Sequence, residues 1–148
     1  MPDALRDADT GLLNEDYFRA ALPNRVATAR RVLRPISIAI LALEPEESSP
    51  GVAYALQDTL RDSDTACRLG DGRFALLLED TPEDGAVLTL ERLRQLLADQ
   101  GVDVQLWGGV AAYPAHALEA GELLALAEGA LADARGTEGG GIGVAPAP

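Results

Sequence analysis

Arginine and aspartate side chains that could bind an anion lie directly before a glycine-rich turn. The stretch from Arg61 to Phe74 reads RDSDTACRLGDGRF and begins with an Arg-x-x-Asp pair, Arg61 and Asp64. A guanidinium group can pair with phosphate, stack on a base and donate two hydrogen bonds to guanine, while a carboxylate accepts hydrogen bonds from guanine N–H groups. The alternative is a surface salt bridge within the pair, which would contribute only about 0–1 kcal/mol to stability.

The acidic composition limits the partners that such a site could have. Twelve basic residues, all of them arginine, stand against 24 acidic residues, and the net charge is −12. Nucleic acid and anionic membranes are polyanions, so we expect neither as a partner, whereas a small anion could still bind where arginines gather. The single Cys67 and the single His116 exclude an intrachain disulfide and a metal site built from several cysteines or histidines. No apolar run reaches membrane-spanning length and no basic signal-peptide start is present, so we expect a cytoplasmic protein.

Alternating helices and strands are predicted to position these side chains. Val52, Leu56 and Leu60 recur every fourth residue, as in a helix, and Gly70-Asp71-Gly72 joins two apolar runs as a hairpin turn, because glycine reaches positive φ angles. The predicted elements are, in order, a helix from residue 15, a strand over 36–43, a loop over 44–51, a helix over 51–61, strands over 66–69 and 74–79, a helix over 82–100, a strand over 102–113, a helix over 119–135 and an edge strand over 142–145.

This order of elements predicts an α/β (α+β) sandwich, with a mixed, mainly antiparallel central sheet flanked by helices. The length indicates one domain, residues 1–145, followed by a disordered tail over 146–148. Gly108-Gly109 inside the strand 102–113 indicates a bulge or a close approach of two backbones. Arg92 lies two residues, about 200° around the helix axis, from the core residue Leu90, so we expect it to face solvent.

Two motifs resemble the GGDEF family, the diguanylate cyclases of bacterial signalling. The first is the family's Gly-Gly-Asp-Glu-Phe turn, which here reads Gly70, Asp71, Gly72, Arg73 and Phe74. The second is the opening signature Asp-x-Leu-Thr-Gly-Leu-x-Asn-Arg-x-x-Phe, which is matched at Asp7, Thr10, Gly11, Leu12, Asn14 and Phe18 and departs at Asp9 and Glu15. The resemblance extends over residues 3–145 and implies the palm-like, ferredoxin-related fold of nucleotide cyclases.

The same resemblance implies that the cyclase chemistry is lost. Joining two GTP molecules needs divalent metal held by carboxylates, which the family supplies from the end of its first strand and from the turn. Here these positions carry Ala42 and Gly72 or Arg73, and the family's guanine-binding stretch is replaced by the shorter, glutamate-rich segment 44–51. We therefore expect no catalytic residue, metal or cofactor. A displaced acidic pair, Glu44 and Asp71, is the alternative.

The family's second nucleotide site, the product-inhibition site, matches better. Its mark is Arg-x-x-Asp at a fixed distance before the turn, where Arg61 and Asp64 stand, and Arg92 matches a further arginine on the following helix. The resemblance thus implies a catalytically inactive receptor that binds cyclic di-GMP through Arg61, Asp64 and Arg92, with a homodimer or ligand-bridged dimer and a protein partner or fused signalling domain. The alternatives are a scaffold or dimerisation module that binds no nucleotide, and an active cyclase, for which we expect no product.

Overall fold

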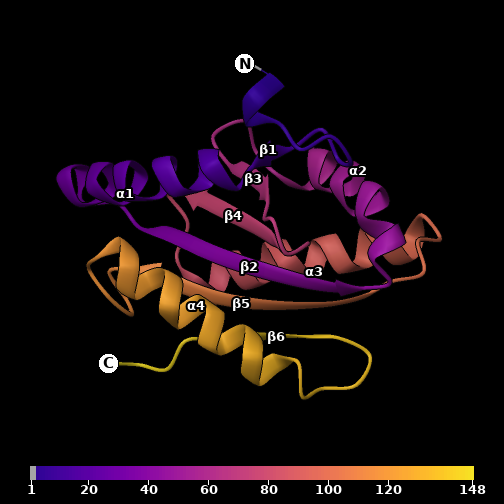
Figure 1. The fold of residues 1–148 in the computed structure, drawn as a ribbon. Coiled ribbons are helices and arrows are strands. Elements are labelled where there is room, and N and C mark those ends of the chain that lie inside the picture. Colours follow the sequence, from indigo (N-terminus) through magenta and orange to yellow (C-terminus); the bar gives the residue numbers. More distant parts are fainter. Residues whose placement is uncertain (1–2) are drawn as a thin grey trace.

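A six-stranded sheet runs through the centre of the structure, a computed structural model that describes residues 3–148 (Figure 1). The strands are β1 (Leu13–Asn14), β2 (Ile36–Glu44), β3 (Thr65–Arg68), β4 (Phe74–Glu79), β5 (Gln105–Tyr113) and β6 (Gly141–Val144). Their order is β1-β3-β4-β2-β5-β6, and the inner strands pair antiparallel while the two edge strands pair parallel to their neighbours. The predicted sandwich with a mixed, mainly antiparallel sheet is confirmed.

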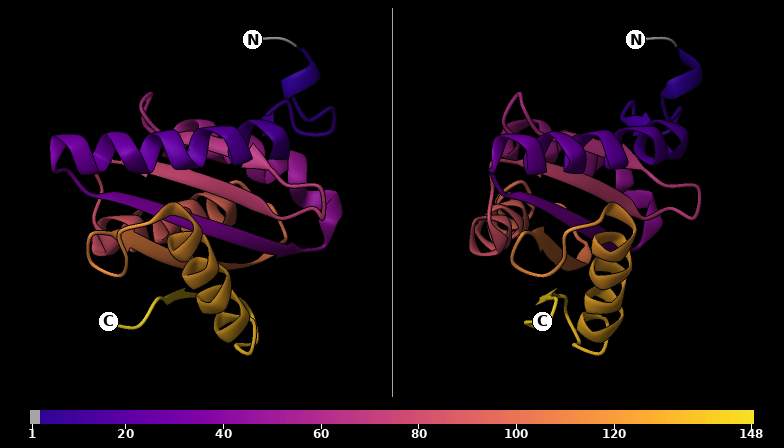
Figure 2. Two further views of the ribbon diagram at one scale, coloured as in Figure 1. Left: turned by 60° about the vertical axis from the view of Figure 1, so that its left-hand side comes forward. Right: turned by 90° about the vertical axis from the view of Figure 1, so that its left-hand side faces the viewer.

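Four helices cover the two faces of this sheet (Figure 2). They are α1 (Glu15–Val32), α2 (Ser49–Thr59), α3 (Glu83–Asp99) and α4 (Ala120–Ala134), and two short 3₁₀ helices, η1 (Asp3–Leu5) and η2 (Glu46–Ser48), add to them. α1 and α4 pack on one face and α2 and α3 on the other. None of the helices within residues 3–148 combines the length and apolar character that a membrane span requires.

Strand β2 shows why the sequence folds this way. Successive side chains of a strand point to opposite faces, and in β2 Ile38 and Ile40 pack against α1 and α4 while Ala39 and Leu41 pack against α2 and α3. Because both faces are covered by helices, the strand reads as a continuous apolar run.

The prediction of a loop over 44–51 is wrong. β2 continues to Glu44, η2 follows, and α2 begins at Ser49 with Pro50 in its first turn. Proline is tolerated there because the first N–H groups of a helix have no intrahelical acceptor. The predicted helix over 51–61 therefore starts and ends two residues earlier, and β5 begins at Gln105 instead of residue 102.

Gly109 marks a close approach of two backbones, as predicted, without a bulge in β5. A Cβ atom at Gly109 would lie 2.2 Å from the carbonyl oxygen of Ala127 and 2.3 Å from the amide nitrogen of Leu131. No side chain fits in that space, so α4 rests directly on the strand backbone.

The single cysteine lies inside the core. Cys67 in β3 has no exposed surface, and its burial raises the pKa of the thiol to about 12. Since the thiolate is the reactive form of cysteine, this side chain stays an unreactive thiol at neutral pH.

Candidate functional site

The glycine-rich turn joins β3 and β4 as a closed hairpin. The amide of Leu69 donates to the carbonyl of Arg73 at 2.8 Å, and the amide of Gly72 donates to the carbonyl of Leu69 at 3.0 Å. Gly72 has a φ of +93°, which favours glycine because a side chain would be strained there. The predicted hairpin and its glycine turn are confirmed.

The charged side chains of the turn bind groups of the protein itself. Arg73 Nε donates to Asp71 at 2.7 Å and its Nη1 donates to Glu128 of α4 at 3.1 Å. Partial burial lowers the pKa of the Arg73 guanidinium, but the hydrogen bonds to Glu128 and Asp71 outweigh this effect and the pKa is raised. Arg73, which stands where the GGDEF family has an acidic residue, thus connects the turn to α4.

Helix α1 holds the turn from its first residue. The amide of Gly70 donates to Glu15 Oε1 at 2.8 Å, and Arg19 pairs with Glu15 Oε2 at 2.6 Å. The backbone hydrogen bond from Gly70, followed by the hydrogen bond from Arg19, lowers the pKa of the Glu15 carboxyl below its ordinary value. Glu15, which departs from the family signature, therefore has a structural role.

A carboxylate that the sequence did not indicate reaches the turn from η2. A Cβ atom at Gly72 would lie 2.6 Å from Glu46 Oε1, so Glu46 fills the space beside this glycine. Arg68, only 10% exposed, donates to the Gly72 carbonyl at 3.0 Å and pairs with Asp9 at 3.0 Å. These contacts give Arg68 a structural role in holding the turn.

The two acids of the displaced pair are each bound to an arginine. Glu44 accepts a hydrogen bond from Arg135 at 2.8 Å, and Asp71 accepts one from Arg73. Ala42, at the family's first metal-binding position, is buried. Across residues 3–148, no group of three or more metal-ligating side chains comes together.

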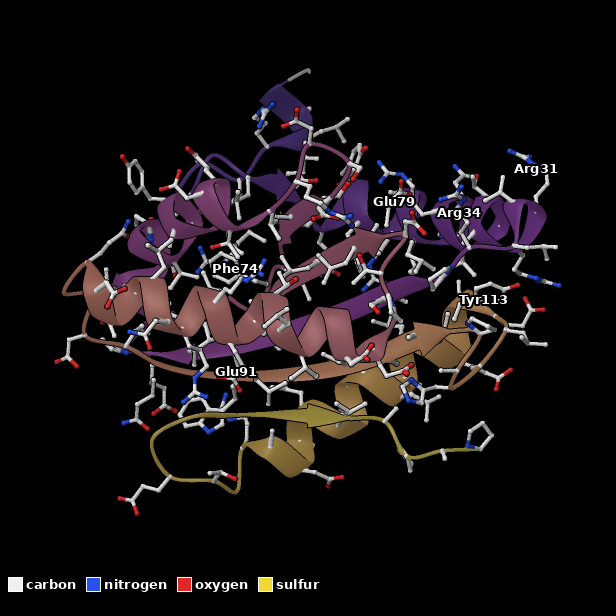
Figure 3. All side chains as sticks on the ribbon, turned by 180° about the vertical axis from the view of Figure 1, so that it is seen from behind. Arg31, Arg34, Phe74, Glu79, Glu91 and Tyr113 are labelled. Atoms are coloured by element: carbon white, nitrogen blue, oxygen red, sulfur yellow. The ribbon has the colours of Figure 1, made fainter. Side chains whose placement is uncertain are left out.

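At the other end of β4, Asp64 organises the loop that follows α2 (Figure 3, where Phe74 and Glu79 mark the two ends of the strand). Its side chain is only 5% exposed. Oδ2 accepts from the backbone amide of Arg61 at 3.0 Å, and Oδ1 accepts from the backbone amide of Glu79 at 3.2 Å. The carboxylate thus ties the loop to the end of the sheet.

The Arg61 guanidinium is fixed on one side and open on the other. Its Nη2 donates to the carbonyl of Glu79, to Thr81 Oγ1 at 2.7 Å and to Asp64 Oδ1 at 3.4 Å. The side chain is nevertheless 56% exposed, and within the described part of the chain Nη1 donates no hydrogen bond. An arginine whose side chain is held in place by the protein and that still has a free donor group can bind a phosphate or the edge of a base.

A cavity of about 370 Å³ lies beside Arg61, between α2 and the β1 edge of the sheet. Its charged lining comprises Arg61, Asp64, Asp62 and Arg6. Its other lining residues are Leu12, Leu13, Leu56, Gln57, Leu60, Thr65 and Ala66. Arg6 was not predicted from the sequence, because it only precedes the Asp7 of the opening signature and no periodic pattern indicates its place.

Arg92 is exposed on α3, as expected, and does not line this cavity. Within residues 3–148, no hydrogen bond or ion pair joins it to Arg61 or Asp64. It lies nine residues, about 13 Å along the helix axis, from Glu83 at the start of α3. The structure therefore brings Arg61 and Asp64 together and leaves Arg92 on a neighbouring helix.

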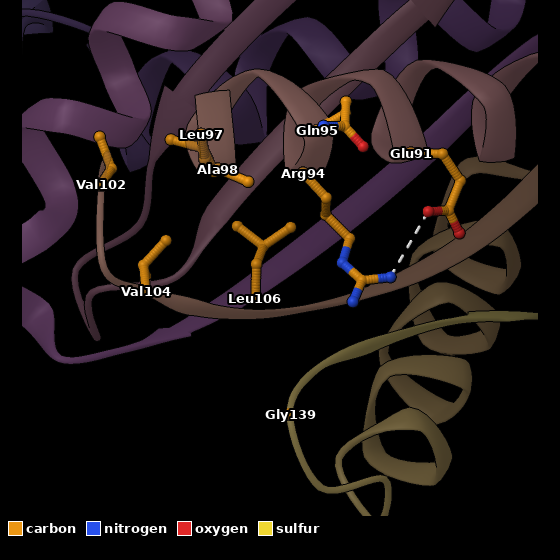
Figure 4. A pocket seen from close by; sticks show the side chains of 9 residues that line it. All are labelled: Glu91, Arg94, Gln95, Leu97, Ala98, Val102, Val104, Leu106 and Gly139. Carbon is orange, nitrogen blue, oxygen red and sulfur yellow. Dashed lines mark hydrogen bonds and ion pairs between the residues drawn. The ribbon is translucent and has the colours of Figure 1, made fainter. Parts of the chain in front are cut away.

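A second cavity, of about 350 Å³, lies between α3 and β5 (Figure 4). Leu97, Val104 and Leu106 supply apolar walls, and Arg94 is paired with Glu91 at 3.4 Å. It contains none of the residues that the sequence indicated for a site.

Comparisons with known proteins agree with this architecture. A family model described as "Diguanylate cyclase, GGDEF domain" matches residues 50–140, more than half of the chain. The probable diguanylate cyclase DgcC of Escherichia coli K12 is 26% identical over an alignment of 103 residues, and the match covers 61% of this chain and 28% of that protein. Diguanylate cyclase DosC of the same strain is 27% identical over an alignment of 119 residues, and the match covers 68% of this chain and 26% of that protein. The matches thus span little more than a quarter of these relatives.

Solved structures show the same fold. The GGDEF domain of YfiN (TpbB) from Pseudomonas aeruginosa superposes with a TM-score of 0.84 at 23% identity, covering 95% of this chain and 94% of that one. The GGDEF domain of DgcB from Caulobacter crescentus, in complex with c-di-GMP, gives a TM-score of 0.83 at 18% identity and covers 97% of both chains. Because the family model matches more than half of the chain, the chain belongs to the GGDEF family.

Proposed function

We propose that this GGDEF domain is a receptor for cyclic di-GMP and has no cyclase activity of its own. The observation that carries the proposal is the state of Arg61, which is anchored by Asp64, Glu79 and Thr81 yet exposes free donors beside a cavity. In this proposal Arg61 contacts the ligand, Asp64 positions Arg61, and Arg92 contributes from α3.

The residues at the family's two metal-binding positions support the loss of activity. Ala42 and Gly72 have no oxygen ligand in their side chains, and Arg73 carries the wrong charge for a metal site. The acids closest in sequence to these positions, Glu44 and Asp71, are bound to arginines. A triphosphate with its metal ion therefore has no carboxylates of the family's kind to bind.

The receptor role is supported by the related DgcB domain, whose structure was solved in complex with c-di-GMP. Cyclic di-GMP carries two phosphates and two guanines, which are the groups that guanidinium side chains bind well. In a chain with a net charge of −12, a cavity that holds two arginines is a favourable place for such an anion.

Isothermal titration calorimetry of the purified chain with cyclic di-GMP, with GTP as the control ligand, tests this function. We expect saturable binding of the cyclic dinucleotide at micromolar or lower concentration and no heat from GTP. Production of cyclic di-GMP from GTP and Mg²⁺ or Mn²⁺ would contradict the inactive state, and absence of binding would contradict the receptor role.

A scaffold or dimerisation module that binds no nucleotide is the second candidate. Large apolar side chains are exposed on the α2 and α3 surface, where Tyr54 is 64% and Leu88 is 52% exposed. Apolar side chains of this kind are suited to protein contacts. Sedimentation of the chain with and without cyclic di-GMP separates the candidates, because a ligand-bridged dimer forms only with the ligand.

A further inference from the structure

The cavity beside Arg61 contains a second guanidinium group, which comes from the start of the chain. Arg6 is exposed and lines this cavity, and its Nη1 donates to the carbonyl of Gly11 at 2.9 Å. A guanidinium has five N–H donors, so this contact orients the side chain and leaves other donors for a ligand. The backbone of Arg6 forms a bridge with Leu13 of β1, which fixes this residue at the sheet edge.

The charge balance of the cavity gives Arg6 its importance. Besides Arg61, the lining holds two carboxylates, those of Asp62 and Asp64, and Asp64 is paired with Arg61. Without Arg6 the lining would carry a net negative charge within a strongly acidic protein, and an anion would be repelled. With Arg6, two guanidinium groups balance two carboxylates, and Asp64 already accepts hydrogen bonds from Arg61 and from the backbone.

The walls of the cavity strengthen the effect of these charges. Five apolar side chains line it, from Leu12, Leu13, Leu56, Leu60 and Ala66. Electrostatic attraction is stronger beside apolar groups than in bulk water, because the local dielectric constant is lower. The volume of about 370 Å³ is also in the range of small-molecule sites.

We propose that Arg6 is a second phosphate-binding residue, so that one cyclic dinucleotide is held by Arg6 on one phosphate and Arg61 on the other. This inference rests on the proposed receptor function and adds a structural response to the bound ligand. A ligand bound to both arginines connects residues 3–12 to the loop after α2, so occupancy strengthens the attachment of residues 3–12 to the β1 edge of the sheet.

Calorimetric titration of four chains with cyclic di-GMP tests the inference. Arg6→Ala should weaken binding about tenfold, the effect of losing one charge-assisted contact. Arg6→Lys keeps the charge without the planar fork and should weaken binding about threefold. Arg31→Ala changes the net charge equally at an exposed site on α1 outside the cavity, and its affinity should stay within about twofold of wild type. Circular dichroism confirms that each variant is folded.

Hydrogen exchange gives a second readout. Cyclic di-GMP should slow amide exchange in residues 3–12 of the wild-type chain, and this slowing should disappear in Arg6→Ala at a ligand concentration that still saturates it. If Arg61→Ala loses affinity while Arg6→Ala binds as wild type, the inference is wrong and the receptor function stands. If the wild-type chain does not bind cyclic di-GMP, both are wrong.

Discussion

The two ends of β4 carry the same kinds of side chain in opposite states. At the Phe74 end, the arginines of the turn bind acids and carbonyls of the protein itself: Arg73 binds Asp71 and Glu128, and Arg68 binds Asp9 and the Gly72 carbonyl. At the Glu79 end, one edge of Arg61 is bound and the other is exposed beside a cavity.

This difference separates structural arginines from an arginine that can bind a ligand. A guanidinium that is mostly buried and bound to acids and carbonyls of the protein, such as Arg68 or Arg73, stabilises the fold but presents little surface to a ligand. A guanidinium that is anchored on a buried carboxylate and exposed on its far side is already oriented. Its side chain therefore loses less conformational entropy when a ligand binds. The comparison predicts that changes at the turn affect stability and changes at the loop affect binding.

Arg61→Ala should give the largest effect on binding. The variant removes the free donors at the cavity, and we expect at least about a hundredfold loss of cyclic di-GMP affinity, about 3 kcal/mol. Arg73→Ala is the matched control at the turn, where affinity should stay within about twofold of wild type. Calorimetry measures both, and equal losses in the two variants would break the comparison.

Rebuilding the family turn should destabilise the protein without restoring activity. In Gly72→Asp combined with Arg73→Glu, the new side chain at position 72 would collide with Glu46 at a φ of +93°, and the Arg73 contact with Glu128 would be lost. We expect a loss of about 2 kcal/mol in the free energy of unfolding by denaturant titration.

The matching position on the first strand still carries Ala42, so this double variant should produce no cyclic di-GMP from GTP and Mg²⁺. Measurable product would show that the turn alone limits catalysis and would contradict the proposed reason for inactivity.

Asp64→Asn should lower both the stability of the protein and its affinity for cyclic di-GMP. The amide keeps the shape of the carboxylate but weakens the hydrogen bonds from Arg61 and from the Glu79 amide, so we expect a loss of about 1.5 kcal/mol in unfolding free energy. Affinity should fall about tenfold because Arg61 is less well oriented. A stability loss with unchanged affinity would limit Asp64 to the fold, and Asp62→Asn is the control for the loss of a neighbouring charge.

The smallest effect is the acid sensitivity of the turn. The pKa of Glu15 is lowered in the folded protein by the Gly70 amide and Arg19, so its stabilising contribution is present above the ordinary value of 4.5 and is lost as pH falls through the lower, folded-state pKa. Thermal unfolding from pH 6 to pH 3 should therefore show a shallower loss of stability for Glu15→Gln than for wild type. Parallel pH profiles would contradict this role of Glu15.

Local sequence patterns were sufficient to predict five of the six strands, the four helices and the hairpin, but not β1, whose two residues are too few to show an alternating pattern. Apolar periodicity and the glycine turn depend on neighbouring residues, and Gly109 was predicted correctly because a glycine pair inside a strand has few explanations. The segment 44–51 was misjudged because proline and serine occur both in loops and in first helical turns.

The cavity at the Arg61 end could be predicted only in part. The spacing of Arg61 and Asp64 is visible in the sequence, but the place of Arg6 depends on a bridge to Leu13 and on the pairing of β1 with β3, more than fifty residues further along the chain. Glu46 likewise reaches Gly72 only in the folded structure. Such long-range placements leave no periodic signal.

The buried position of Cys67 makes the natural chain suitable for spectroscopic labelling. Since its only thiol is buried and stays protonated at neutral pH, maleimide reagents should leave the folded protein unmodified. A cysteine introduced by Ala8→Cys, at an exposed position between Arg6 and Gly11, would then be the sole point of attachment for a fluorophore. Its anisotropy would report ligand-dependent changes around residues 3–12 in real time, without any need to remove the native cysteine.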